Sequence, residues 1–354
     1  MERNQNILEW LKEDFDEIWE ENIPWERLNN RSVLVTGASG LIGSCFVYAL
    51  LDRNIRYGSN IHIIVLARNR ERLFNKFGQY DNVNLIAQDV SEEIKWPGTV
   101  DYIIHAACDV QPITSTGNPV GTCKTILDGT FSVCDFACKV GAKVINISSV
   151  NAFGRAYREE PFSDELFADI PLNDCSYAYH EGKRMSEMIC ASYAAQYRMK
   201  YSILRIGRVY GPTMNITDSM VLSSFLLQAA TGHDLTLKSR GTQRYTYVYV
   251  ADVVSALFYL MFNGEAKYYN CGEDTKLEER DLGEIARLIC DVNHVQLQRA
   301  EMSGDEKQIY SKTIYCMMTS ENLMELGWKK KNDIVRGIKK TSNILRYLYG
   351  NKKL

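Results

Sequence analysis

The chain has 354 residues, a formal net charge of −3 and 45% hydrophobic residues. A chain of this length buries enough apolar surface to fold without disulfide bridges. Its slight negative charge argues against a nucleic-acid-binding protein, which normally carries a basic field. Prolines are few (7) and no low-complexity tract is present, so extended disorder is not expected.

The cysteines and the N-terminal segment indicate a cytoplasmic protein. Ten cysteines occur without a CxxC pair, and there are only five histidines, so we expect free thiols in a reducing compartment and no metal site. Residues 1–21 are rich in Glu and Asp, unlike a secretory signal peptide. The longest apolar run, at 256–262, is too short to cross a bilayer, so no membrane association is expected.

Residues 1–30 are predicted to form an N-terminal helical extension. Ile7, Leu11, Phe15 and Ile18 recur at helical spacing, which gives a helix over 7–19 one apolar face. We expect this face to dock on the core of the protein.

From residue 31 onward, short apolar runs alternate with helical segments. Such alternation is typical of an α/β protein with a doubly wound parallel sheet covered by helices on both faces. Residues 31–212 are therefore predicted to form one domain, and 213–354 a smaller C-terminal α/β lobe, with 245–262 returning to the first domain. The predicted strands are 32–36, 61–66, 83–87, 102–105, 143–147 and 201–205, and the long predicted helices are 119–139 and 176–199.

A glycine-rich turn, TGASGLIG, occupies residues 36–43 between the first predicted strand and a helix. This is the context that a dinucleotide-binding turn requires, because the glycines admit a pyrophosphate and the free N–H groups of the helix face it. The GxxGxxG spacing resembles the short-chain dehydrogenase/reductase superfamily and implies a Rossmann NAD(P)-binding domain. The residues expected to hold the cofactor here are Gly37, Ser39, Gly40, Leu41, Ile42 and Gly43.

The same resemblance implies cofactor contacts at the ends of later strands. Asp89–Val90 follow the third strand, where the superfamily places an Asp beside the adenine ring, and Ala106–Ala107 follow the fourth. At the end of the second strand, NAD users usually carry an Asp for the ribose 2′-hydroxyl, whereas this chain has Arg68, with Arg70 nearby. We expect NAD, with NADP as the alternative because an Arg at this point can receive a 2′-phosphate.

A tyrosine, a lysine and a serine form the candidate catalytic group. Tyr179 and Lys183 are four residues apart and share one face of a predicted helix, and Ser149 follows the fifth strand. Tyrosine has an ordinary pKa of about 10, so it serves as a base near neutral pH only when nearby positive charge favours the phenolate. We expect the Lys183 ammonium and the nicotinamide charge to lower the pKa of Tyr179, both residues to contact the cofactor, and Ser149 to orient the substrate oxygen.

With these residues placed, the chain from about residue 32 to 347 resembles the extended short-chain dehydrogenases that act on nucleotide sugars. The resemblance is closest to UDP-glucuronate decarboxylases and dTDP-glucose 4,6-dehydratases. It implies a nucleotide sugar bound between the Rossmann domain and the smaller lobe, and a homodimer formed by the helices at 119–139 and 176–199. The segments that carry it are YHEGKRMSE at 179–187, LRIGRVYGP at 204–212, VLSSFLLQAATG at 221–232, YVYVADVV at 247–254, YNCG at 269–272 and ELGW at 325–328.

The expected substrate site departs from that family's pattern at two places. After Ser149, at the family's Ser/Thr position, Val150 and Asn151 stand where dehydratases and decarboxylases carry an acidic residue. The arginine that grips the sugar-nucleotide phosphates aligns with Tyr245, and Arg244 comes one residue earlier, on the opposite face of a strand. The residues expected to bind substrate are Ser149, Asn151, Arg208, Arg244 and Tyr245.

These residues predict an enzyme that oxidises or reduces a nucleotide sugar at C4 through NAD, as an epimerase or a 4-keto reductase. Asn151 cannot exchange a proton near neutral pH, and Glu181 lies about 200° around the helix from Tyr179, so neither is expected to serve dehydration or decarboxylation. The resemblance keeps that chemistry as an alternative. Two others are an NADPH-dependent reductase of another carbonyl compound, suggested by Arg68, and a non-catalytic dinucleotide sensor.

Overall fold

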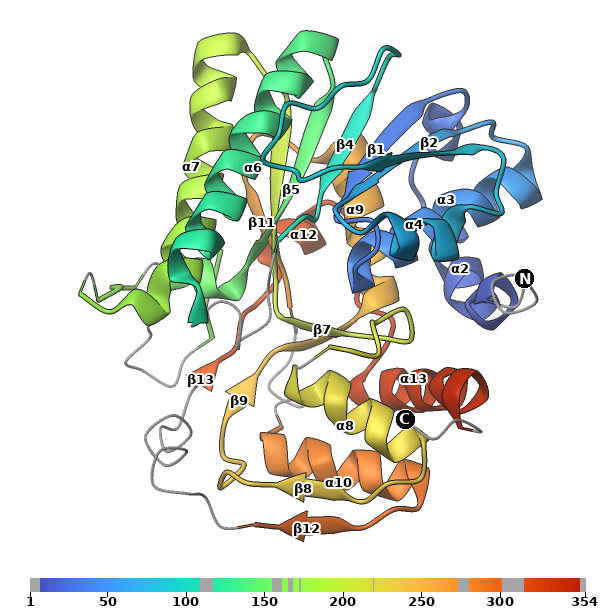
Figure 1. Cartoon of the computed structure of the whole chain (residues 1–354), viewed down its shortest axis with the longest axis vertical. Helices are drawn as coiled ribbons and strands as arrows, with labels where there is room; N and C mark the ends of the chain where they lie inside the picture. The colour runs from blue at the N-terminus through green and yellow to red at the C-terminus, as the bar shows by residue number, and fades with distance from the viewer. Residues whose placement is uncertain are drawn as a thin grey trace.

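The computed structural model describes residues 7–108, 117–154, 161–164, 168–171, 173–218, 220–272, 280–300 and 315–350. Its largest element is a seven-stranded parallel sheet in the order β11-β6-β5-β4-β1-β2-β3 (Figure 1). The order 3-2-1-4-5-6 is that of the Rossmann dinucleotide-binding fold, which confirms the predicted fold class. The strands are β1 (Ser32–Thr36), β2 (His62–Ala67), β3 (Val83–Ala87), β4 (Tyr102–His105), β5 (Lys143–Ser149), β6 (Tyr201–Ile206) and β11 (Tyr268–Cys271).

Successive side chains of these strands supply two hydrophobic cores, one on each face of the sheet. In β1, Val33 and Val35 belong to one core and Leu34 to the other, and all three are fully buried, as expected for a strand covered on both sides. The first core takes in α3 (Leu41–Tyr57), α4 (Arg70–Phe77) and α9 (Val250–Asn263), and the second takes in α6 (Pro119–Val140) and α7 (Ala178–Tyr197).

Two segments from the C-terminal half of the chain belong to this first domain. The helix α9 packs against α3. The strand β11 pairs with β6, with Tyr269 opposite Leu204, and α12 (Glu321–Glu325) packs on it. From the sequence, only 245–262 was expected to return to the first domain, and the structure adds β11. This edge strand, YYNC, is only four residues long.

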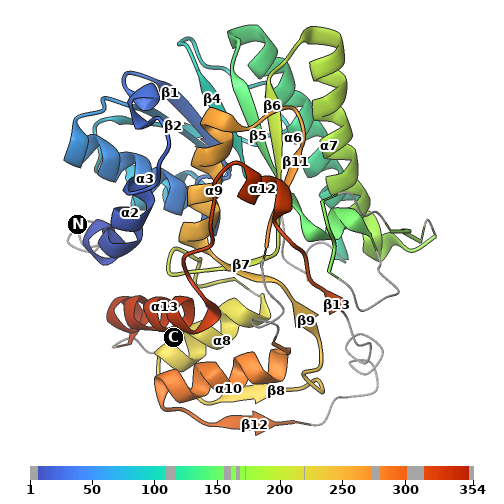
Figure 2. The same ribbon diagram turned by 180° about the vertical axis from the view of Figure 1, so that it is seen from behind.

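The smaller lobe is built on three helices that pack on one another, α8, α10 and α13, with the strand pair β8–β12 at its far side (Figures 1 and 2). Two short pairs, β7–β10 and β9–β13, lie between it and the large sheet. The helices of this lobe are α8 (Val221–Ala230), α10 (Leu282–Asn293) and α13 (Ile334–Tyr349). The strands of these pairs are β7 (Arg208–Tyr210), β8 (Leu235–Leu237), β9 (Arg244–Tyr245), β10 (Tyr247–Tyr249), β12 (Leu297–Arg299) and β13 (Tyr315–Cys316). Short 3₁₀ helices occur earlier in the chain: η1 (Trp25–Leu28), η2 (Val150–Phe153) and η3 (Cys175–Tyr177).

The N-terminal helix α2 (Lys12–Trp19) joins the two parts of the molecule. It buries Phe15 and Ile18 in the first core. The buried Asp14 accepts hydrogen bonds from the hydroxyl of Tyr249 (2.7 Å) and from Nζ of Lys340 on α13 (2.6 Å). Across the described part of the chain, no helix has the length and apolar character needed to cross a membrane.

Candidate active site

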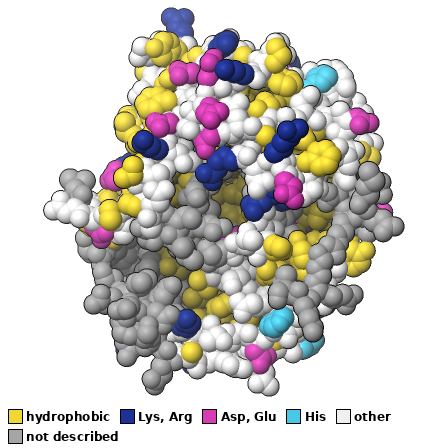
Figure 3. All heavy atoms as spheres, viewed as in Figure 1, with side chains coloured by type: hydrophobic (Ala, Val, Ile, Leu, Met, Phe, Trp, Pro, Cys, Tyr) yellow, Lys and Arg dark blue, Asp and Glu magenta, His cyan; other side chains and the backbone are white. Residues whose placement is uncertain are grey.

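A cavity of about 730 Å³ opens where the carboxyl ends of the parallel strands meet the smaller lobe, the usual place for a ligand in such a sheet. Figure 3 shows Lys and Arg side chains beside a hollow near the middle of this face. The wall contains all the site residues expected from the sequence except Arg244: Gly37, Ser39, Gly40, Leu41, Ile42, Gly43, Arg68, Asp89, Val90, Ala106, Ala107, Ser149, Asn151, Tyr179, Lys183, Arg208 and Tyr245.

Two features of the glycine turn suit a pyrophosphate: its close backbone packing leaves no room for side chains at Gly37 and Gly43, and the first N–H groups of the following helix face the cavity. Gly37 has φ +65°, and a Cβ on it would lie 2.6 Å from the carbonyl oxygen of Ala106. A Cβ on Gly43 would lie 2.5 Å from the carbonyl oxygen of Gly37. Helix α3 begins at Leu41, after the extended Gly40, so its first N–H groups border the cavity and favour an anion.

The end of β4 is fixed by a buried histidine. Nδ1 of His105 lies 2.9 Å from Oγ1 of Thr36, which also accepts a hydrogen bond from the N–H of Ala107 (3.3 Å). Burial, and next the charge of Lys183, lower the pKa of His105 to about 3. The imidazole is therefore neutral at physiological pH, and it holds the small residues at 106–107 against the glycine turn.

At the ends of β2 and β3, Arg68 already has a carboxylate beside it. Nε of Arg68 lies 4.0 Å from Asp89, and the Arg68 side chain is 59% exposed. Burial raises the pKa of Asp89, but hydrogen bonds from Ser91 and the charge of Arg68 outweigh it and leave the pKa lowered. Arg70 is exposed at the start of α4 and does not line the cavity. This arrangement favours an uncharged ribose hydroxyl over a 2′-phosphate.

The candidate catalytic residues meet between α7 and β5. Tyr179 and Ser149 both line the cavity, and Oγ of Ser149 accepts a hydrogen bond from the N–H of Asn151 (3.2 Å). Nζ of Lys183 donates to the carbonyl oxygen of Ile147 (2.8 Å) and lies 6.0 Å from the centre of the Tyr179 ring. Burial raises the pKa of Tyr179, against the smaller lowering effects of Ser149 and Arg208. The ammonium of Lys183 is directed at the carbonyl oxygen of Ile147, and its effect on the pKa of Tyr179 stays a prediction.

A buried ion pair that was not predicted from the sequence anchors the same helix. Glu187 accepts hydrogen bonds from Nε (2.9 Å) and Nη2 (2.6 Å) of Arg205 and from Oγ of Ser148 (2.6 Å). Arg205 is 1% exposed and lies on β6 directly opposite Ser148. Since Glu187 follows Lys183 by four residues, the helical spacing that linked Tyr179 to Lys183 was the signal that could have found it.

Beyond the catalytic residues, the cavity wall is polar and cationic. The guanidinium of Arg208 lies 4.0 Å above the ring of Tyr245. Burial lowers the pKa of Arg208, but Tyr245 and Tyr247 outweigh it and leave the pKa raised. Arg244 is exposed and outside the wall, because neighbouring residues of β9 face opposite ways. Of these two arginines, Arg208 therefore contributes positive charge to the cavity wall and Arg244 does not.

His180 is a second residue that the sequence analysis missed. It lines the cavity beside Tyr179, and burial, with the charges of Arg208 and Arg184, lowers its pKa to about 4. Among the described residues, neither Nδ1 of His180 nor Nε of Arg208 finds a hydrogen-bond partner, although both atoms are buried. Two such polar atoms in one wall call for a polar ligand.

The fold and the site define an NAD-dependent enzyme of the Rossmann type. The family model described as "NAD dependent epimerase/dehydratase family" matches residues 33–272. UDP-glucuronic acid decarboxylase 6 of Arabidopsis thaliana is 30% identical over 313 residues, which are 88% of this chain and 87% of that protein. This protein belongs to the NAD-dependent epimerase/dehydratase family.

Solved structures of several enzymes share the fold. A UDP-glucose 4-epimerase from Thermotoga maritima superposes with a TM-score of 0.75 at 24% identity, covering 90% of this chain and 99% of that chain. A dTDP-glucose 4,6-dehydratase from Bacillus anthracis in complex with NAD gives 0.71 at 18% identity, covering 89% and 96%. At these identities the likeness concerns the fold.

Proposed function

We propose that this protein binds a nucleotide sugar in the 730 Å³ cavity and carries out oxidation and reduction at sugar C4, as an epimerase or a 4-keto reductase. The observation that carries the proposal is the pairing of an intact Ser149–Tyr179–Lys183 group with Asn151. Tyr179 in this group can exchange a hydroxyl proton with the substrate during hydride transfer. The side-chain amide of Asn151 cannot give or take a proton.

Tyr179, Ser149 and Lys183 each have a distinct role in the proposed reaction. Tyr179 takes the proton of the C4 hydroxyl and returns it, and Ser149 hydrogen-bonds the same oxygen as its charge changes. Lys183, fixed by Ile147, holds the nicotinamide ribose. Bound NAD supplies hydride exchange with C4. Because burial keeps the pKa of Tyr179 high, the positive nicotinamide is needed to make this residue an effective base.

The charge of Arg208 is suited to the diphosphate of the substrate. Arginine presents several donors to phosphate oxygens, and the unpartnered Nε of Arg208 provides one of them. Stacking on Tyr245 holds the guanidinium in place. The family's phosphate arginine is replaced by Tyr245 in this chain, and Arg208 takes over its charge from a neighbouring strand.

Decarboxylation of a nucleotide glucuronate is the second candidate, because eight curated relatives carry the name UDP-glucuronic acid decarboxylase. Among the described residues of the wall, the carboxylates are Asp89 and Asp218. Asp89 lies at the end of β3, and Glu181 is outside the wall, 3.6 Å from Arg184. Among the described residues, no carboxylate is hydrogen-bonded to Ser149, whose Oγ accepts from the N–H of Asn151, and this supports C4 redox chemistry alone.

The assembly that we propose is a homodimer through α6 and α7. These two neighbouring helices expose the apolar side chains of Val120, Phe131, Met185, Met188 and Tyr197, more than a monomer surface needs. We also propose a cytoplasmic location, which suits the ten unpaired cysteines. Light scattering of the purified protein, compared with a Met188→Glu variant, tests the dimer.

The function is tested by incubating the protein with NAD and a panel of UDP- and dTDP-sugars, or with NADH and the 4-keto forms of these sugars, and following C4 by proton NMR. We expect interconversion or reduction at C4 with the rest of the sugar intact. Tyr179→Phe should lower turnover about a thousandfold and leave NAD affinity unchanged, whereas Tyr177→Phe, on the preceding turn, should retain full activity. One tenth of the normal rate in Tyr179→Phe would contradict the proposal.

A further inference from the structure

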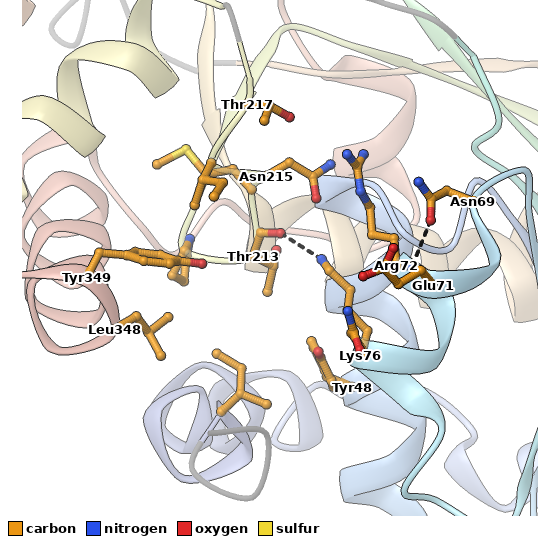
Figure 4. Close-up of a pocket in the computed structure, with 15 residues that line it drawn as sticks. Tyr48, Asn69, Glu71, Arg72, Lys76, Thr213, Asn215, Thr217, Leu348 and Tyr349 are labelled. Atoms are coloured by element: carbon orange, nitrogen blue, oxygen red, sulfur yellow. Dashed lines mark hydrogen bonds between the residues drawn. The ribbon is translucent and has the colours of Figure 1, made fainter. Parts of the chain in front are cut away.

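A second cavity adjoins the candidate active site and has no role in the proposed reaction. It measures about 560 Å³ and is walled by α4, the loop at 212–217 and the end of α13 (Figure 4). Asn69, Arg72, Asn215 and Thr217 line both cavities. Its size is within the range of small-molecule sites.

Lys76 is the central polar group of this second cavity. Its Nζ donates hydrogen bonds to Oγ of Ser44 (3.0 Å) and to the carbonyl oxygen of Thr213 (3.2 Å), both of which are neutral. No carboxylate of the described residues forms an ion pair with it. Burial, together with the charge of Arg72 one turn earlier on α4, lowers the pKa of Lys76 to about 8. Within the described part of the chain, this ammonium lacks the negative partner that desolvated charges normally have.

The wall has two chemically different sides. Arg72, Lys76 and the exposed Glu71 come from α4, which gives two cationic groups against one carboxylate. Across the cavity, Figure 4 shows Leu348 and Tyr349 at the end of α13. A ligand that satisfies both sides needs an anionic end and an apolar body.

We propose that this second cavity binds a small phosphomonoester with a flat apolar body, such as a nucleotide or an aryl phosphate. The phosphate carries between one and two negative charges at neutral pH, which matches Lys76 and Arg72 at adjacent turns of α4, and charge-assisted hydrogen bonds hold it there. Leu348 and Tyr349 cover the body, and Asn215 offers hydrogen bonds to its polar edge.

The site is coupled to the glycine turn through short hydrogen bonds. Ser44, which accepts from Lys76, donates to the carbonyl oxygen of Gly40 (2.7 Å). Thr213, whose carbonyl also accepts from Lys76, donates through Oγ1 to the carbonyl oxygen of Leu41 (2.8 Å). An anion on Lys76 therefore adds negative charge beside the turn that faces the NAD pyrophosphate, and it weakens NAD binding.

Calorimetric titration of the full chain with phenyl phosphate at low ionic strength tests the site without any need for turnover. We expect saturable binding, about tenfold weaker for Lys76→Met and also weakened for Leu348→Trp, which fills the apolar side and leaves Lys76 in place. Lys139→Met, at the exposed end of α6, is the matched control and should bind normally. Inorganic phosphate, which lacks the body, should bind more weakly than phenyl phosphate.

Coupling is measured by titrating NAD with and without saturating phenyl phosphate. We expect NAD affinity to fall about fivefold, and phenyl phosphate affinity to fall by the same factor when NAD is bound. Absence of binding by the normal protein overturns the site, and so does an affinity in Lys76→Met and Leu348→Trp that equals that of the normal protein. An unchanged NAD affinity overturns the coupling.

Discussion

The 730 Å³ cavity has two halves that are built differently, one that we propose for the cofactor (the cofactor half) and one that we propose for the substrate (the substrate half). The cofactor half, which comprises the glycine turn at 36–43 and the loop at 106–107, is shaped by backbone that passes so close that Gly37 has no room for a Cβ. The substrate half, which comprises Asn151, His180, Arg208 and Tyr245, is shaped by side chains. Because a crowded backbone tolerates few residue types, the cofactor half keeps the glycine motif at 36–43. The side chains of the substrate half can be exchanged without moving the backbone, so its chemistry can differ from that of the relatives.

The largest effect on ligand affinity is expected from a methyl group in the cofactor half. Gly37→Ala places a Cβ 2.6 Å from the backbone of Ala106, so the turn must move and NAD affinity should fall at least about a hundredfold. Gly58→Ala is the matched control, because Gly58 has nearly the same φ, +62°, but open space around it. It should cost about 1 kcal/mol of stability and leave NAD binding unchanged. Calorimetry measures both, and equal losses in the two variants would refute the crowding argument.

For the substrate half, the test compares two arginines: Arg208, which lines the cavity, and Arg244, which does not. Arg208→Met should raise the KM for a nucleotide sugar about thirtyfold, since a charge-assisted hydrogen bond is lost, with little change in NAD affinity. Arg244→Met, on the opposite face of β9, should leave KM within about twofold. Steady-state kinetics decide between them, and the reverse order would return the phosphate contact to Arg244.

A smaller effect should appear in the pH dependence of stability. Burial holds the pKa of His180 at about 4 and that of His105 at about 3, both below the ordinary 6.5. The unfolded chain therefore binds more protons between pH 6.5 and 4, so the free energy of unfolding falls as the pH falls through this window. His180→Gln should reduce that fall by about 1 kcal/mol, measured by urea unfolding at pH 7 and pH 5. An identical fall in the variant would show that His180 titrates normally.

The same contrast explains what the sequence predicted. The sheet and the glycine turn were predictable because apolar runs and GxxGxxG report local backbone needs. The strand β11 was missed because it is only four residues long, YYNC, and lies at the sheet edge. The stacking of Arg208 on Tyr245 was beyond the sequence because it joins segments that only the folded chain brings together. Helical spacing could have placed Glu187 on the face of Lys183, but it could not have shown that the partner of Glu187 is Arg205.

The central claim is that the substrate half supports redox chemistry at C4 but not loss of a carboxyl group. The most direct measurement uses UDP-glucuronate labelled with carbon-13 in its carboxyl group, incubated with the protein and NAD while released carbon dioxide is followed. Because Asn151 cannot exchange a proton, we expect no labelled carbon dioxide. Any product should be the intact C4 epimer. Stoichiometric release of labelled carbon dioxide with formation of a UDP-pentose would contradict it.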